Sequence, residues 1–135
     1  MIDLEAYITS SGRYKDRANS PDLNKAAILY ATILLERVNK ALKHLGIEQV
    51  DVSSGFRPFG TNGKVGGSKR SAHMTGQAID LMDDKDQSLA KAFTKPILEK
   101  FDLYRENYTD TRGKWTNWVH LQTRPVPSGK RIFKP

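Results

Sequence analysis

The clearest hydrophobic pattern lies in the first third of the chain. Apolar residues recur at three- and four-residue steps from Leu23 to Leu45, a spacing that is typical of an amphipathic α-helix. Ser20 is a suitable N-cap, Pro21 suits the first helical position, and Gly46 is a natural stop. Extra apolar residues widen the apolar side, as expected when a helix packs against a sheet. The pattern therefore predicts one long packing helix.

The rest of the chain predicts short strands separated by turns and loops. Strands are expected at residues 47–53, 77–82 and 117–123, with another beginning at Leu103. The glycine-rich stretch FGTNGKVGGSKR, between the first two strands, predicts a loop. The acidic stretch after the second strand predicts a helix that is interrupted near Pro96. The C-terminal tail is expected to be irregular.

The order of these elements and the length of the chain limit the fold. The order predicts an α+β fold, in which helices pack on one side of a small antiparallel sheet. A doubly wound parallel sheet would need a more regular alternation of strands and helices. The chain has 135 residues, so we expect a single domain over residues 1–135 with a buried core.

Composition restricts the chemistry and the partners. The chain contains no cysteine, so any metal must be held by His, Asp or Glu. Its 22 Lys and Arg against 15 Asp and Glu give a net charge of +7, which favours polyanions such as nucleic acid, anionic lipid or an anionic cell wall. The basic residues are scattered and form no dense block with aromatics, so we expect no dedicated nucleic-acid site.

The sequence shows no targeting or membrane-spanning segment. No apolar run near the start resembles a signal peptide, and none approaches the roughly 18 apolar residues of a transmembrane helix. We therefore expect a soluble cytoplasmic chain without a membrane span that acts as a monomer. Action outside the cytoplasm would require its release or its transport by another agent.

Three polar side chains form a candidate metal site. His73 ends the glycine-rich loop, and Asp80 lies on the strand that follows. His120 lies on a later strand, on the same side as Trp118 and Gln122. Two imidazoles and one carboxylate with an open fourth position are typical of catalytic zinc, which lowers the pKa of a bound water to about 7. By spacing alone, ordinary surface or core histidines explain the pattern equally well.

Residues near the candidate ligands support this arrangement. Gly76 and Ala78 have almost no side chain, so they would allow His73 to fold back toward Asp80 without crowding. Gln122 or a backbone carbonyl could hold the outer ring nitrogen of a ligand histidine. His44, at the end of the predicted helix, is expected to have a capping role instead.

The stretch SGFRPFGTNGKVGGSKRSAHMTGQAIDL resembles zinc D-Ala-D-Ala carboxypeptidases and phage L-alanyl-D-glutamate endopeptidases. The matching motifs are SAH, which ends at His73, GQAID, which ends at Asp80, and WVH, which ends at His120. The resemblance covers about residues 53–122. It implies a hedgehog/DD-peptidase-like fold, with Zn²⁺ held by these three residues at the face of the sheet. It also implies a peptidase that cleaves peptidoglycan stem peptides and is of phage or prophage origin.

The resemblance suggests roles for three further residues. It implies that Arg57 binds a substrate carboxylate or steadies the polarised carbonyl, which suits a rigid fork of donors. The alternative for Arg57 is a salt bridge that braces the sheet edge. Ser71 is a candidate for binding substrate or for bracing the loop by hydrogen bonds. Trp118 is a candidate for stacking on the substrate stem or for packing in the core.

The chain departs from the family pattern at the general base. Many relatives carry Glu or Asp three residues before the last His ligand, and this chain carries Asn117, which cannot act as a base. Others carry a histidine shortly before that ligand, where this chain has Trp115 and its neighbours. Glu106, with Asp110 as second choice, could supply the base from the strand or loop that leads into the site. An ordinary solvated loop carboxylate explains Glu106 equally well.

Two explanations do not need a replacement base. Zinc-bound hydroxide could work slowly without a strong base, with Asn117 orienting water or substrate. Alternatively, the fold has kept the metal as a staple and lost turnover, which would make the protein a phage structural or binding module. A nucleic-acid binder rests on charge alone and ranks below both. The leading interpretation is a zinc peptidase that acts on peptidoglycan.

Overall fold

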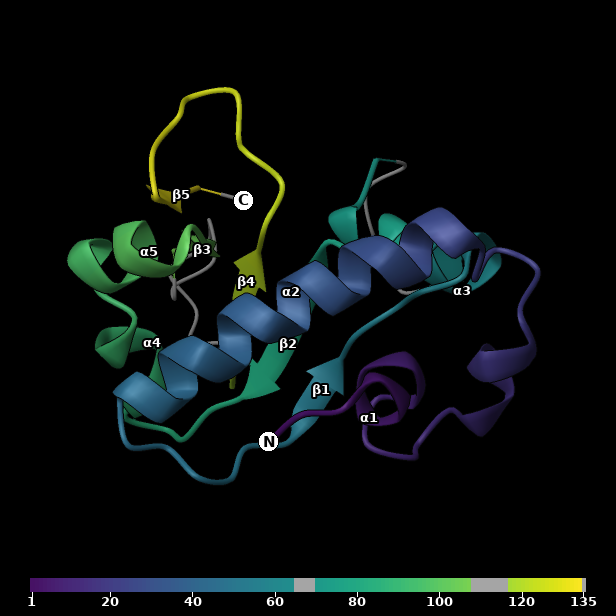
Figure 1. Cartoon of the computed structure of the whole chain (residues 1–135), viewed down its shortest axis with the longest axis horizontal. Coiled ribbons are helices and arrows are strands. Elements are labelled where there is room, and N and C mark those ends of the chain that lie inside the picture. Colours follow the sequence, from purple (N-terminus) through teal and green to yellow (C-terminus); the bar gives the residue numbers. More distant parts are fainter. Residues whose placement is uncertain (65–69, 108–116, 135) are drawn as a thin grey trace.

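A computed structural model of the chain describes residues 1–64, 70–107 and 117–134. Its first half contains α1 (Leu4–Thr9), the 3-10 turn η1 (Lys15–Asn19), α2 (Lys25–His44), β1 (Val52–Ser54) and α3 (Phe59–Lys64). Its second half contains η2 (Ala72–Thr75), β2 (Ala78–Met82), α4 (Ser88–Ala92), α5 (Lys95–Phe101), β3 (Tyr104–Glu106), β4 (Trp118–Gln122) and β5 (Ile132–Phe133). Figure 1 shows the long α2 lying across the sheet.

The predicted long helix is confirmed, but its start is not at Ser20. The helix begins at Lys25 because the Asn24 Oδ1 atom accepts a hydrogen bond from the Ala27 amide at 2.9 Å. Ser20 caps a separate turn, in which its Oγ atom accepts from the Asp22 amide. The other end agrees with the prediction, since the helix stops two residues before a glycine with positive φ.

The sheet is mixed, and its order is β1-β2-β4-β3-β5. All neighbouring pairs are antiparallel except β3 and β5, which run parallel. The α+β prediction is confirmed, while three details differ from it. The first strand is shorter than predicted, the glycine-rich stretch contains the short helix α3, and part of the tail forms the edge strand β5.

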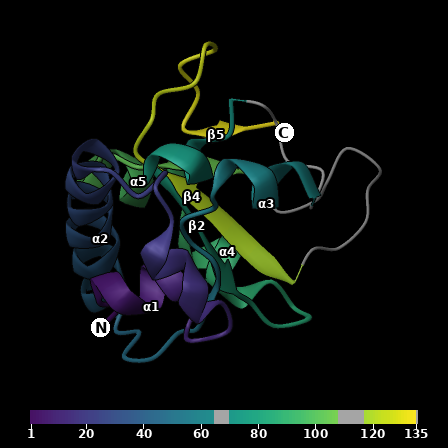
Figure 2. The same ribbon diagram turned by 90° about the vertical axis from the view of Figure 1, so that its right-hand side faces the viewer.

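Side chains of the strands β2 and β4 alternate between the two faces of the sheet, so that one face joins the core and the other is polar. Ile79 and Leu81 of β2 are fully buried, as are Val119 and Leu121 of β4, and all four belong to the hydrophobic core. The core also takes the buried residues of α2, α4 and α5, and Figure 2 shows α2 along one side of the sheet. The intervening residues of the two strands face the other way.

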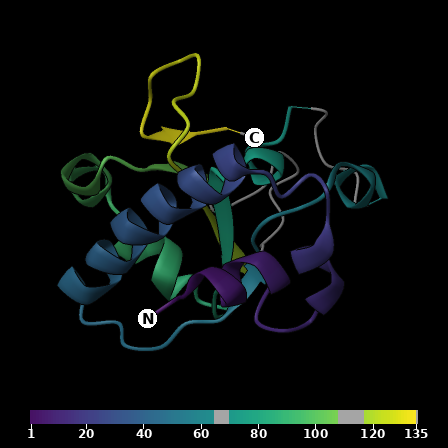
Figure 3. The same cartoon turned by 45° about the vertical axis from the view of Figure 1, so that its right-hand side comes forward.

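The N-terminal segment packs against this framework, although its sequence predicted no element there. Helix α1 contacts α2, β1 and η1 (Figure 3). Tyr7 is fully buried, and its hydroxyl donates a hydrogen bond to the Ala78 carbonyl at 2.9 Å. The segment is therefore tied directly to the strand that carries Asp80. Among the described residues, no helix is long and apolar enough to cross a membrane.

Candidate metal centre

The site begins with the pairing of β2 and β4. Their register places Asp80 directly opposite His120, and β1 places Ser54 on the other side of Asp80. His73 comes from η2, the turn that leads into β2. The Asp80 Oδ1 atom lies 2.8 Å from His120 Nδ1 and 3.3 Å from His73 Nε2. One potential ligand atom from each of the three residues lies within 4.8 Å of the others.

The outer nitrogen of each imidazole is held by an oxygen that can only accept a hydrogen bond. His73 Nδ1 lies 2.8 Å from the Gly55 carbonyl, and His120 Nε2 lies 2.8 Å from Gln122 Oε1. Both outer nitrogens therefore carry a proton, and the inner nitrogens, His73 Nε2 and His120 Nδ1, lie on the side of Asp80. The expected hydrogen bond from Gln122 is present, and a backbone carbonyl serves the other histidine.

Two glycines allow the elements that carry the site to approach closely. A Cβ atom on Gly76, whose φ is +79°, would collide with the Ala27 carbonyl of α2. A Cβ atom on Gly55 would collide with the backbone carbonyl of Tyr7. The crowding that Gly76 relieves is thus between η2 and α2, and not between the two candidate ligands as the sequence suggested.

Electrostatics prepares two of the three groups, Asp80 and His73, for a cation. Burial alone would raise the pKa of Asp80, but His73 and His120 outweigh it and hold that pKa well below its usual range. Burial lowers the pKa of His73, which stays neutral at physiological pH. Asp80 is then a carboxylate and His73 a free base, as metal coordination requires. Burial alone would lower the pKa of His120, but its hydrogen bond to Asp80 outweighs burial and raises that pKa, so a metal would have to displace a proton from His120. Two imidazoles and one carboxylate fit Zn²⁺ by their donor chemistry.

Arg57 lies beside the carboxylate of this cluster. Its Nη2 atom is 3.3 Å from Asp80 Oδ2, its Nε atom donates to Ser54 Oγ at 3.0 Å, and its backbone amide donates to the His73 carbonyl at 3.1 Å. The guanidinium is thus fixed at the edge of the metal face, where a substrate carbonyl or carboxylate can reach it. The salt bridge and the proposed substrate role are compatible.

The family model of peptidase M15 matches residues 9–122. The chain belongs to the peptidase M15 family. The resemblance noted in the sequence is confirmed, and the match extends into the N-terminal segment that the motifs did not cover. No curated protein matches the chain. At the level of the family, the protein is a zinc-type metallopeptidase of peptidoglycan, and His73, Asp80 and His120 are the group that could hold the metal.

Glu106 of this M15 protein faces the same side of the sheet as the candidate ligands. The register that pairs Arg105 with Leu121 places Glu106, one step further, opposite His120. Burial raises the pKa of Glu106, while the nearby His120 acts in the opposite direction. Its carboxylate makes no hydrogen bond within the described residues. Glu106 is thus a half-buried carboxyl with a raised pKa beside the candidate ligands.

The remaining predicted residues lie on the rim of the site. Asn117 is exposed just before β4, and its carbonyl accepts from the Asp83 amide. Trp118 is 39% exposed, which excludes the core-packing alternative. The Ser71 Oγ atom accepts from the His73 amide at 3.2 Å, so Ser71 caps the turn that carries the ligand. Trp115 and Asp110 lie outside the described residues.

A cavity of about 330 Å³ opens beside Asp80 on the β1 side. The residues that line it are Tyr14, Arg17, Ser53, Ser54, Arg57, Asp80 and Trp118. Sequence reasoning missed Tyr14 and Arg17, because they lie in a segment that shows neither a hydrophobic period nor a motif. Nothing local indicates that the residues of η1 meet the metal face.

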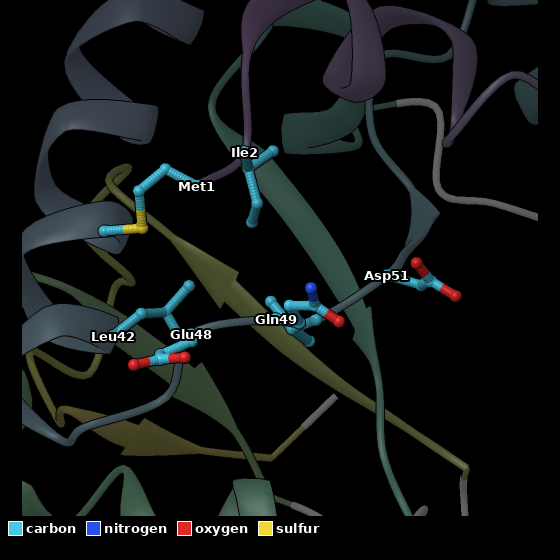
Figure 4. A pocket seen from close by; sticks show the side chains of 7 residues that line it. Met1, Ile2, Leu42, Glu48, Gln49 and Asp51 are labelled. Atoms are coloured by element: carbon cyan, nitrogen blue, oxygen red, sulfur yellow. The ribbon is translucent and has the colours of Figure 1, made fainter.

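Another hollow, of about 200 Å³, lies away from the candidate ligands. It is formed by the N-terminus, the end of α2 and the segment before β1, and Figure 4 shows Glu48 and Asp51 among its side chains. Its lining residues do not include His73, Asp80 or His120. This hollow is therefore separate from the candidate metal centre.

Proposed function

We propose that the protein hydrolyses a peptide bond in peptidoglycan stem peptides, as a zinc-dependent endopeptidase or D,D-carboxypeptidase. The observation that carries this proposal is the geometry of the two imidazoles. Each has its outer nitrogen held by an acceptor, so both inner nitrogens face the Asp80 carboxylate. When bound there by His73, Asp80 and His120, Zn²⁺ lowers the pKa of a coordinated water and polarises a carbonyl.

Glu106 is the group that we assign as general base. Its carboxylate takes a proton from the attacking water as the water oxygen bonds to the substrate carbonyl carbon. It then passes that proton to the nitrogen of the leaving amine as the carbon–nitrogen bond breaks. Its raised pKa supports this role, because a base with a pKa closer to neutrality transfers protons in both directions more readily.

Arg57 and the rim residues position the substrate in this proposal. Arg57 donates to the carbonyl oxygen on which negative charge develops, since its guanidinium is already fixed next to Asp80. Trp118 stacks on the peptide, and Asn117 orients the substrate or water at the open side of β4. Ser71 supports the turn of His73, and a direct contact between Ser71 and substrate stays a prediction.

The origin and the site of action belong to the same proposal. The net charge of +7 would favour an anionic cell wall. Together with the resemblance to phage endopeptidases, this supports a phage- or prophage-derived enzyme that reaches the wall after release or transport. We propose that it acts as a monomer, which light scattering of the purified protein would test.

The first experiment combines metal content with turnover on one sample. Zinc per chain is counted, and the protein is incubated with peptidoglycan while new amino termini are measured, with and without a chelator. We expect one zinc and chelator-sensitive release, and Glu106→Gln should lose the release while it keeps the zinc. Glu99→Gln is the matched control, because Glu99 is exposed on α5 and its carboxylate pairs only with Lys95 among the described residues.

A non-catalytic module is the second candidate, and Asn117 favours it. This residue replaces the acidic group that many relatives carry at the same place. Stoichiometric zinc without release from several wall types would support a structural metal. In that case the wild-type protein and Glu106→Gln would both release no new amino termini from peptidoglycan.

A further inference from the structure

The cavity beside Asp80 contains a buried cation that the proposed mechanism does not use. Arg17 belongs to η1, and only 6% of its surface is exposed. Its Nη1 atom donates to Ser10 Oγ at 3.1 Å and to the Phe56 carbonyl at 3.0 Å. Both partners are neutral, and within residues 1–64, 70–107 and 117–134 no carboxylate forms an ion pair with Arg17. A buried charge without an ion pair is costly, and a bound anion would offset that cost.

Two donor atoms of Arg17 are not used within the described residues. Its Nε and Nη2 atoms donate no hydrogen bond within the described chain, and the side chain lines the cavity together with Asp80. The guanidinium carbon lies 4.0 Å from the centre of the Tyr14 ring, which holds the planar group in one orientation. The donors that remain form a fork suited to a planar anion.

The balance of charge in the cavity points to the same group. Arg57 is paired with Asp80 at 3.3 Å, so these two charges largely cancel. Arg17 therefore supplies the excess positive charge of the cavity. Burial lowers the pKa of Arg17, and the positive charge of Arg57 acts in the same direction, while Tyr14 and Asp16 oppose them. A bound anion would offset both effects.

We propose that this cavity is a carboxylate subsite, in which Arg17 binds a free carboxylate of the substrate next to the bond that is cleaved. The inference rests on the proposed peptidase function and names its substrate class. The volume of about 330 Å³ is at the small end of ligand pockets, which span roughly 300–1,000 Å³. It suits a single residue with its carboxylate. Ser53 and Ser54, which also line the cavity, offer hydroxyls beside it.

Stem peptides provide such a carboxylate in two ways. One is the terminal carboxylate of a D-alanyl-D-alanine end, and the other is the α-carboxylate of a D-glutamyl residue linked through its side chain. Peptide bonds that lack a free carboxylate within one residue would be poor substrates. The chemistry at Arg17 is the same for both sources, so the choice of peptide distinguishes them.

The first test uses the wild-type zinc protein and two pairs of synthetic peptides. One pair ends in D-alanyl-D-alanine as acid or amide, and the other contains L-alanyl-D-glutamate with its α-carboxylate free or amidated. In one pair we expect kcat/KM to be about 10- to 100-fold higher for the acid than for the amide. This is the effect expected when the amide loses a charge-assisted hydrogen bond that the carboxylate accepts. The pair that shows the preference identifies the source. Equal rates for acid and amide in the pair that is cleaved would overturn the subsite.

The second test measures binding without turnover. Acetyl-D-alanine, acetyl-D-glutamate and their α-amides are titrated into zinc-loaded Glu106→Gln protein, with and without Arg17→Gln. We expect the preference for an acid over its amide to fall about 10-fold or more in the Arg17 variant. A preference that is unchanged by Arg17→Gln would show that the acid binds elsewhere, for example to zinc, and would overturn the proposal.

Controls separate charge, folding and function. Arg13→Gln removes the same charge from the same segment, but Arg13 donates to the Val52 carbonyl and does not line the cavity, so its acid preference should be unchanged. Arg17→Lys keeps the charge and should retain part of the preference. If no peptide is cleaved but binding still depends on Arg17, the hydrolytic function fails while the subsite stands. If peptides are cleaved without a preference for the acid over the amide, the hydrolytic function stands and the carboxylate subsite fails.

Discussion

The two candidate histidine ligands reach the same carboxylate in different ways. His73 is buried in a turn, and its ring is held by the backbone carbonyl of Gly55. His120 lies on a strand, and its ring is held by the side chain of Gln122. The rings meet edge to face, with their centroids 5.2 Å apart. The orientation of His73 thus depends on how the backbone packs, whereas that of His120 depends on one replaceable side chain.

Removal of either imidazole should have the largest effect, and the two should differ in stability. His73→Ala and His120→Ala should both lose stoichiometric zinc, measured by atomic absorption. In chelator, His73→Ala should cost about 2–4 kcal/mol of unfolding free energy because it leaves a cavity in a packed turn. His120→Ala should cost less, because its side chain is 14% exposed. His44→Ala, at the exposed end of α2, is the control, and equal losses in the two ligand variants would contradict the comparison.

A change in the backbone should disturb His73 and spare His120. Gly76→Ala combines positive φ with a collision against the Ala27 carbonyl, so we expect a loss of about 1–3 kcal/mol in a denaturant titration. Zinc affinity should fall as η2 moves. Gly129→Ala is the matched control, since its φ is +71° but nothing lies within 4 Å of the added Cβ. If both variants lose the same stability, then the packing against α2 is unimportant.

A change in one side chain should disturb His120 and leave the fold intact. Gln122→Ala removes the acceptor of His120 Nε2, so zinc affinity should fall about 10- to 100-fold, as is usual for such outer partners. Competition with a fluorescent chelator would measure it. Gln122→Glu keeps an acceptor and should retain more affinity than Gln122→Ala. A large loss of stability in Gln122→Ala would mean that its contact with the Arg124 carbonyl matters more.

The smallest expected effect concerns Glu106 in metal-free protein. Burial raises its folded-state pKa above the unfolded value, so its contribution to stability is full at low pH. That contribution is lost as pH rises from the unfolded pKa through the folded pKa. Glu106→Gln should therefore melt at a higher temperature than wild type at neutral pH, and the difference should disappear near pH 4. A variant that melts lower at neutral pH would show that the ionised carboxylate stabilises the fold.

Local patterns predicted the parts of the site that lie on regular elements. The spacing from Leu23 to Leu45 gave the packing helix, and the alternation around Asp80 and His120 gave two strands with the correct residues on the polar face. The resemblance to zinc peptidases then grouped these two residues with His73. Helix boundaries were less predictable, since Ser20 and Asn24 are both good caps and only packing selects between them.

The sequence by itself determined the long helix, the two central strands and the candidate metal-binding set, because each depends on neighbours within a few residues or on a motif. The tertiary structure alone decided that Glu106 lies beside His120, through the pairing of β3 with β4. It also decided that Arg17 is buried against the Phe56 carbonyl, 39 positions away along the chain. Burial and counter-charge arise from contacts between distant segments, and a linear pattern carries no record of them.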